Sequence, residues 1–170
     1  MILNLNPYQA PQPYPALRNV KPDKGLANAL SHGYCGERSE LSTVMQYAYH
    51  SLQCKEKAAE YSQMLRGIFY VETLHMDFLG NCVRMLGEEP QYLLPLNEKK
   101  IEWQSGVIDY MDSPAHMLEA DITGEQFAVK FYMEMAASTK QPEISELLSR
   151  LAEDEKLHVR ILDKLHKRLF

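Results

Sequence analysis

The most informative segment of the sequence is Gly67–Leu79, GIFYVETLHMDFL, which carries a glutamate and a histidine three residues apart at Glu72 and His75. In a helix these two side chains point the same way, because one turn takes 3.6 residues. A carboxylate on a buried face is costly without a partner, and a metal ion is one partner that would neutralise it. The neighbouring positions on this face are all apolar: Leu65, Ile68, Phe69, Met76 and Leu79.

The same spacing returns near the end of the chain, in RLAEDEKLHVRIL, at Glu155 and His158. Both segments read Glu-Xaa-Leu-His with a further leucine four residues later. Two such sequences alone are weak evidence in a glutamate-rich chain, so their surroundings must carry the argument. The adjacent Glu153 and Asp154 are predicted to point away from the apolar face and to lie on the surface.

Length and composition bound the class of protein. A chain of 170 residues with 45% hydrophobic content predicts one compact domain, and scarce glycine with long runs of helix-forming residues predicts an all-α fold. The net charge of −5 argues against nucleic acid as a partner, and we expect neither a membrane span nor a signal peptide. Three widely spaced cysteines without a Cys-Xaa-Xaa-Cys pair indicate a reduced, cytoplasmic compartment and exclude a rubredoxin-type iron centre.

Proline and helix signals divide the chain in two. Residues 1–22 hold five of the nine prolines and predict an extended arm, which is either a loose tail or docked on its own bundle or on another subunit. Residues 23–170 are predicted to form a four-helix bundle domain after a short first helix, with Gly33 and Gly36 bending the chain. The predicted helices are 23–32, 37–53, 55–86, 113–138 and 142–168, with an irregular crossover at 88–112.

A single glutamate precedes each motif at nearly the same interval, Glu40 in the first half and Glu125 in the second. Each is followed by a valine at +4 and a tyrosine at +7, so Tyr47 and Tyr132 share its helix face. Antiparallel helices would bring each glutamate level with its motif. The resulting set matches the di-iron or di-manganese site of four-helix bundles: Glu40, Glu72, His75, Glu125, Glu155 and His158.

The ligand chemistry predicts two metal ions per chain. Carboxylate oxygens and imidazole suit iron and manganese, and four carboxylates neutralise two divalent ions. Each imidazole adds one neutral ligand and keeps its other ring nitrogen for a supporting contact. Both metals accept these donors, so the sequence does not distinguish a pair of Fe ions from a pair of Mn ions.

Over residues 37–168 the chain resembles the ferritin-like superfamily, alongside rubrerythrins, bacterioferritins and manganese catalases. Gly124 and Glu125 resemble the corresponding rubrerythrin helix. The stretch from Tyr14 to Ser42 is similar to the N-terminal part of manganese catalases and of their spore-coat relatives. The resemblance implies an antiparallel four-helix bundle with one long crossover and an extended N-terminal arm.

The resemblance also implies a role for each residue of the set. Tyr47 and Tyr132 would lie beside the carboxylates with a catalytic role, or they are plain core aromatics. Glu72 and Glu155 would be the bridging carboxylates, and Glu40 and Glu125 the terminal carboxylates. His75 and His158 would each bind one metal ion.

The implied function is a di-metal oxidoreductase acting on hydrogen peroxide or dioxygen, as a peroxidase or a catalase. Alternatives are a ferroxidase or iron-storage protein and a structural, spore-coat-type protein that keeps the metal site. Because no rubredoxin-like segment is present, a peroxidase cycle would need a separate electron donor. Ala128 stands where rubrerythrins carry a further glutamate, so their carboxylate movement is not implied. We expect a homo-oligomer.

Three further polar residues adjoin the set. Glu37 and Asp121 lie one turn before Glu40 and Glu125 and are predicted to be polar groups at the bundle ends, with gating or spare ligation as the alternative. His50 is predicted to be a hydrogen-bonded core or supporting histidine rather than a ligand.

Overall fold

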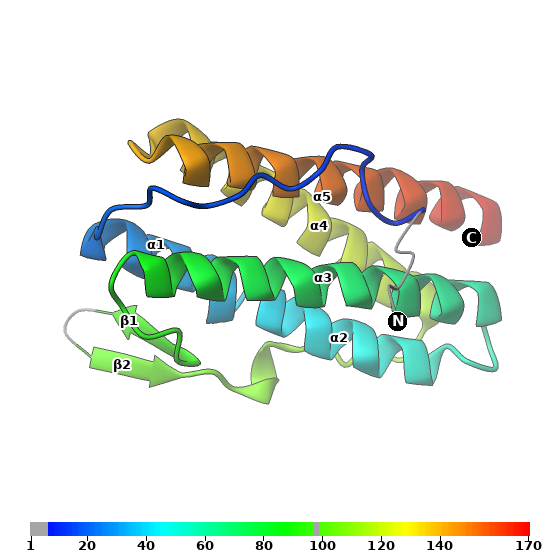
Figure 1. Ribbon diagram of the computed structural model, residues 1–170. Helices are drawn as coiled ribbons and strands as arrows, with labels where there is room; N and C mark the ends of the chain where they lie inside the picture. Colours follow the sequence, from blue (N-terminus) through cyan, green and yellow to red (C-terminus); the bar gives the residue numbers. More distant parts are fainter. Residues whose placement is uncertain (1–6, 97–98) are drawn as a thin grey trace.

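The computed structural model describes residues 7–96 and 99–170, and most of this part of the chain is helical (Figure 1). The predicted all-α, ferritin-like architecture is confirmed. A small antiparallel hairpin is added to it. The elements are α1 Lys24–Cys35, α2 Glu40–Gln53, α3 Ala59–Met85, β1 Leu93–Leu96, β2 Lys99–Glu102, the 3-10 turn Ser105–Val107, α4 Pro114–Ser138 and α5 Pro142–Leu169.

Two antiparallel helix pairs make up the bundle. In the first pair α1 and α2 follow one another along α3, and in the second pair α4 packs against α5 (Figure 1). The long crossover returns the chain to the end of the bundle from which α3 started. As a result α3 and α4 run in the same direction.

Local capping explains where the helices begin and end. The side chains of Asp23, Ser39 and Ser113 each accept a hydrogen bond from a backbone N–H in the first turn of the helix that follows. Pro114 occupies the first position of α4, where no intrahelical N–H is needed. After α3 the chain turns at Gly87, whose φ of 96° is the left-handed conformation that glycine adopts at low cost.

The break between α1 and α2 is sharper than predicted. α1 continues through Gly33 to Cys35, and the next helix begins at Glu40 rather than at Glu37, which is exposed in the turn. A Cβ on Gly36 would lie 2.5 Å from the carbonyl oxygen of His32, so the chain can bend this tightly only at glycine. Glu37 therefore does not share a helix face with Glu40.

The other boundary errors arise at connections. α3 begins at Ala59 rather than at residue 55, and the crossover contains a hairpin instead of being irregular throughout. β1 pairs with β2 in antiparallel register, with Leu93 opposite Glu102. Just after this hairpin the Trp103 indole N–H donates to Ser42 Oγ at 2.9 Å, which ties the crossover to the start of α2.

Apolar side chains form two clusters along the bundle, one on each side of its middle. On α3, Ile68 belongs to one cluster and Leu79 to the other, while on α5 Leu162 and Leu151 divide in the same way. Burying one such side chain contributes about 1.5–3 kcal/mol, so these clusters hold the helices together. The polar residues of both motifs lie between them.

The described part of the arm, residues 7–22, runs extended along α5 on the side facing α3 (Figure 1). It is hydrogen-bonded to α5 at Arg150, Asp154 and Glu143. The remainder of the predicted arm, residues 1–6, lies outside the described residues. Within the ranges that the structure describes, no helix combines the length and apolar character needed to cross a membrane.

Candidate metal centre

The six residues predicted from the sequence repeat converge between the four long helices. α3 supplies Glu72 and His75, and α5 supplies the second motif. Glu40 is the first residue of α2, and Glu125 lies at the middle of α4. All six side chains are buried: Glu40, Glu72, His75, Glu125, Glu155 and His158.

Their donor atoms form two groups of four that share two carboxylates. In each group one donor atom from every residue lies within 4.8 Å of the others. Glu72 and Glu155 belong to both groups. The first group adds Glu40 and His75, and the second adds Glu125 and His158.

The imidazoles face the shared carboxylates through Nδ1. His75 Nδ1 lies 2.9 Å from Glu155 Oε1 and 3.6 Å from Glu72 Oε2. His158 Nδ1 lies 2.8 Å from Glu72 Oε1 and 3.1 Å from Glu155 Oε2. Each shared carboxylate therefore spans the space between the two rings, as a bridging ligand must.

Electrostatics divides the carboxylates into two kinds. Burial raises the pKa of Glu40 and of Glu125 well above the usual carboxyl range, and the nearby charge of Glu72 adds to both. Burial would also raise the pKa of Glu72, but the His158 and His75 rings hold that pKa well below its usual range. Four buried carboxyl groups thus compete for too little positive charge.

The imidazoles respond in the opposite sense. Burial would lower the pKa of His75 and His158, but Glu155 beside the first ring and Glu125 beside the second raise the pKa of both well above the ordinary value. Protons on these rings supply charge that divalent cations would supply better.

One oxygen provides a direct test of whether a cation fits. Glu72 Oε1 is buried and, among the described residues, accepts no well-aligned hydrogen bond, although His158 Nδ1 lies 2.8 Å away. An orphaned buried carboxylate oxygen is costly, and coordination to a metal would satisfy it. Because the donor set is four carboxylates and two imidazoles, these residues fit a pair of Fe or Mn ions.

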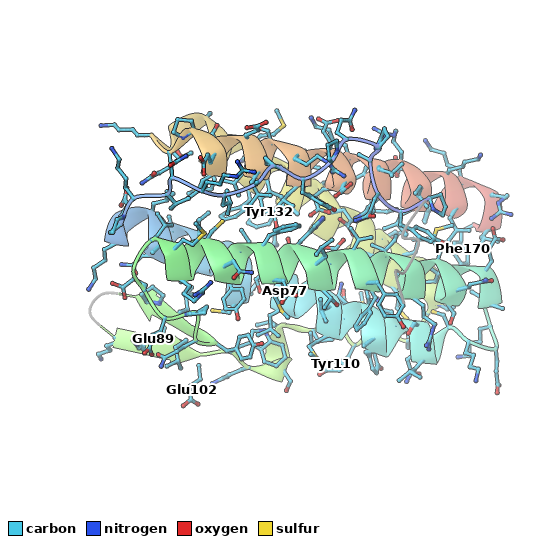
Figure 2. The ribbon with its side chains drawn as sticks, in the orientation of Figure 1. Asp77, Glu89, Glu102, Tyr110, Tyr132 and Phe170 are labelled. Atoms are coloured by element: carbon cyan, nitrogen blue, oxygen red, sulfur yellow. The ribbon has the colours of Figure 1, made fainter. Side chains whose placement is uncertain are left out.

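The two tyrosines of the repeat hold the unshared carboxylates crosswise. Tyr47 on α2 donates a hydrogen bond to Glu125 on α4, and Tyr132 on α4 donates one to Glu40 on α2. Tyr132 lies inside the bundle, between the helix pairs (Figure 2). Each phenol thereby occupies Oε1 of its carboxylate.

The prediction that Asp154 lies on the surface is wrong. Its side chain is buried, and Oδ2 lies 3.1 Å from His75 Nε2, the ring nitrogen that faces away from the centre. A signal was present in the sequence, because Leu147, Leu151, Asp154 and His158 recur at the spacing of one helix face. Glu153, by contrast, is exposed as predicted.

Asp121 is not a bundle-end group either. It is buried, and its carboxylate lies 2.9 Å from His50 Nδ1 and accepts hydrogen bonds from Tyr61 and from Gln46 Nε2. The other nitrogen of His50 lies 2.8 Å from the Asp109 carbonyl oxygen. The prediction that His50 is a hydrogen-bonded core histidine is therefore confirmed. Its partner is Asp121, for which the predicted position at the end of the bundle is wrong.

A cavity of about 340 Å³ reaches the centre from the side where α2 and α4 meet. At its inner end it is lined by Glu40 and Tyr132, and along α4 by Thr123 and Gly124. Arg38 also lines it and stacks over the Phe127 ring, with the guanidinium carbon 5.3 Å from the ring centroid. A small molecule could approach the Glu40 carboxylate by this path.

Comparisons with known proteins match the two halves of the chain separately. A family model described as manganese containing catalase matches residues 14–93, and one described as rubrerythrin matches residues 116–170. No curated protein sequence matches significantly.

Several solved structures share the fold. A manganese catalase from Anabaena has a TM-score of 0.81 at 19% identity, covering 95% of this chain and 80% of the catalase. A bacterioferritin from Rhodobacter capsulatus has a TM-score of 0.72 at 22% identity, covering 88% of each chain. An uncharacterised conserved protein from Magnetospirillum magnetotacticum has a TM-score of 0.60 at 23% identity, covering 84% of this chain and 91% of that one.

These matches and the bundle define a ferritin-like protein of the di-metal carboxylate class. The manganese catalase model and the rubrerythrin model each match less than half of the chain, one in its first half and one in its second.

Proposed function

We propose that this chain is a non-haem di-metal oxidoreductase that consumes hydrogen peroxide, with two Fe or two Mn ions held by the six residues. The observation that carries the proposal is the pair of four-residue donor groups sharing Glu72 and Glu155. The family model that matches residues 14–93 is that of manganese containing catalases, which supports peroxide as the substrate and manganese as one of the two candidate metals. Bound Fe or Mn would supply a two-level redox couple and a Lewis acid for the peroxide oxygens.

The protein's own residues would prepare the site for that chemistry. Glu72 and Glu155 would bridge the ions, and the single carboxylates would bind one ion each. Tyr132 and Tyr47 keep Oε1 of those single carboxylates engaged, which leaves Oε2 for the centre. The flanking apolar clusters exclude bulk water from the carboxylates and strengthen their electrostatic interactions.

Substrate access is proposed through the cavity between α2 and α4. Its inner end at Glu40 would bring an incoming peroxide beside that carboxylate, which would exchange a proton with it while the Tyr132 hydroxyl holds the carboxylate in place. The lining includes the polar, exposed side chains of Glu37, Arg38 and Thr123, which suits a small polar substrate such as hydrogen peroxide.

Metal content is the first test. Elemental analysis of protein produced with both Fe and Mn supplied should find about two ions per chain, and the Glu72→Ala variant should lose them. Glu153→Ala is the matched control, because Glu153 is an exposed glutamate on α5 outside the donor groups. A metal-free wild-type protein, even after anaerobic reconstitution, would contradict the proposal and leave a helical bundle with a structural task.

Peroxide assays on the loaded protein then separate the two enzyme types. A catalase releases one molecule of dioxygen for every two of peroxide consumed, with no added reductant. A peroxidase releases none and requires a separate electron donor. If the loaded protein consumes peroxide in neither assay, the proposed enzyme function is wrong, although the metal site would remain.

A ferroxidase is the second candidate, supported by the likeness to bacterioferritin over 88% of the chain. It predicts that added Fe(II) is oxidised by dioxygen far beyond two equivalents per chain and is retained as a mineral. Mass measurement in solution tests the cage that such storage needs. The same measurement tests the predicted homo-oligomer.

A further inference from the structure

The ring nitrogens that face away from the centre are held on the side covered by the N-terminal arm. His158 Nε2 lies 2.9 Å from the backbone carbonyl oxygen of Tyr8. A carbonyl oxygen only accepts hydrogen bonds, so Nε2 of this ring must carry the proton. The contact therefore reserves Nδ1 for the carboxylates and for a metal.

His75 is held by the arm through one intermediate, Asp154. The carboxylate of Asp154 faces His75 Nε2 at 3.1 Å and accepts hydrogen bonds from the Ala10 N–H and the Tyr14 hydroxyl, both at 2.6 Å. Two hydrogen-bond donors from the arm thus orient the Asp154 carboxylate, which in turn contacts the His75 ring.

Arg150 locks the same stretch of the arm onto α5. Its guanidinium donates to the carbonyl oxygens of Gln12 and Ala10 at 2.6 and 2.7 Å and lies 2.7 Å from Asp154 Oδ1. It also stacks on the Tyr14 ring, with 4.3 Å between the guanidinium carbon and the ring centroid. The side chain is 7% exposed, so these charge-assisted contacts are sheltered from water.

The Tyr8 ring packs against α3 at Gly67, where any larger residue would clash with it. A Cβ on Gly67 would lie 2.1 Å from Tyr8 Cε2. The ring therefore rests directly on the backbone of the helix that carries Glu72 and His75. Placing a methyl group there must displace the ring and so removes an anchor of the segment that carries the Tyr8 carbonyl.

We infer that residues 8–14 of the arm are a positioning segment for the metal centre, which orients both imidazoles through their Nε2 atoms. The inference rests on the proposed metal site and adds a part of the chain that supplies no ligand. Because coupling is reciprocal, bound metal should in turn hold the arm more firmly on the bundle.

Two variants test this without altering a ligand. Gly67→Ala displaces Tyr8 while improving the helix propensity of α3, and Tyr14→Phe removes one donor to Asp154 while keeping the ring. Glu143→Ala is the matched control, because Glu143 accepts the N–H groups of Arg18 and Asn19 in a part of the arm that contacts neither histidine. Circular dichroism checks that each variant keeps its helices.

Affinity for Mn²⁺, measured by competition with a chelator, is the first readout. We expect each test variant to bind Mn²⁺ about 10–100-fold more weakly than wild type, as loss of a supporting contact to a ligand typically does. Glu143→Ala should keep the wild-type affinity. Wild-type affinity in both Gly67→Ala and Tyr14→Phe would overturn the inference and leave the proposed function intact.

Hydrogen exchange of the arm is the second readout. Adding Mn²⁺ should slow exchange of the Ala10 amide in wild type and in the control, and do so less in the test variants. The inference would also be overturned if the test variants bound Mn²⁺ more weakly but Mn²⁺ did not change the exchange rate of the Ala10 amide in any of the proteins. The loss of affinity would then not be transmitted through the arm. A wild-type protein that binds no Mn²⁺ or Fe²⁺ would remove the proposed function and the inference together.

Discussion

Each unshared carboxylate of the six-residue set accepts a hydrogen bond from a tyrosine of the other helix pair. Tyr132 holds Glu40 and Tyr47 holds Glu125, so the internal repeat of the sequence reappears as a crossed pair of hydrogen bonds. Burial raises the pKa of both phenols well above the usual value, and the carboxylate beside each adds to the rise. The phenols therefore stay protonated as donors near neutral pH.

Removing one of these hydroxyls should loosen its carboxylate. Tyr132→Phe leaves Glu40 with an unsatisfied buried oxygen, and a hydrogen bond to a charged group contributes about 1.5–3 kcal/mol. We expect weaker metal binding with unchanged helical content, measured by chelator competition and circular dichroism. Tyr34→Phe is the control, since its hydroxyl lies 3.3 Å from the Pro90 carbonyl oxygen and the residue belongs to neither donor group. Equal affinities in the two variants would contradict the supporting role of Tyr132.

At the scale of elements, the centre depends on how helices start and end. The turn at Gly36 stops α1 and allows α2 to begin at Glu40, so this ligand candidate sits at a helix N-terminus. There the partial positive charge of the helix favours the ionised carboxylate. Ser39 and Ser42 both donate to the Gly36 carbonyl oxygen, at 2.7 and 2.9 Å, and so tie the turn to the first residues of α2.

Substituting that glycine should damage the centre from a distance. In Gly36→Ala the new Cβ collides with the His32 carbonyl oxygen, and the turn must open. We expect a destabilisation of about 1–3 kcal/mol in denaturant unfolding and a loss of metal from the group that contains Glu40. Gly25→Ala is the control, since the Cβ at this glycine of α1 would meet Asp23 Oδ1 at an ordinary 3.4 Å, and it should lower neither the stability nor the metal content.

The cavity between α2 and α4 is the proposed access route to the site. A Cβ on Gly124 would meet no described atom within 4 Å, because the position opens into the cavity. Gly124→Leu should fill that space and slow peroxide consumption several-fold, with the metal content unchanged. Ala137→Leu, an exposed position near the end of the same helix, controls for the added side chain. An unaltered peroxide rate in Gly124→Leu would exclude this access route.

For the whole molecule, the centre is a polar layer between two apolar clusters. The clusters favour folding, whereas burying four carboxyl groups between them opposes it unless positive charge is supplied. Metal ions would bind the folded chain and not the unfolded one, so they should stabilise it by mass action. Chelation is then expected to lower the melting temperature of the whole bundle.

After chelation, stability should fall as pH rises. The pKa values of Glu40 and Glu125 are raised from about 4.5 and those of His75 and His158 from about 6.5, so the folded chain binds more protons than the unfolded one. The stability that these four groups contribute is fully present below their pKa values in the unfolded chain. It is lost as the pH rises through their pKa values in the folded chain. Glu72 acts oppositely, but only near and below pH 4.5.

Thermal unfolding across pH measures this effect. We expect the chelated protein to have a lower melting temperature at pH 8 than at pH 6, and the Mn-loaded protein to lose much of that slope. Glu125→Gln should flatten the chelated curve and raise its stability at pH 8, because a buried charge is removed. Stability of the chelated protein that rises between pH 6 and pH 8 would contradict these assignments.

Local patterns in the sequence determined the all-α class, most helix ends and the candidate ligands. Helical periodicity and capping act over a few residues, so Ser113 and Pro114 placed the start of α4 correctly. The repeat around Glu40 and Glu125 predicted that the six residues would meet, and the structure places them together. Their role as metal ligands stays a prediction.

Only the tertiary structure decided what surrounds that set. Tyr14 and Asp154 are 140 positions apart in the chain and meet because the arm docks along α5. The burial of Asp154 and of Asp121 likewise depends on partners from other elements, His75 in one case and His50 in the other. No local pattern specifies such contacts, because the free energy that orders them comes from packing between distant segments rather than from helix propensity.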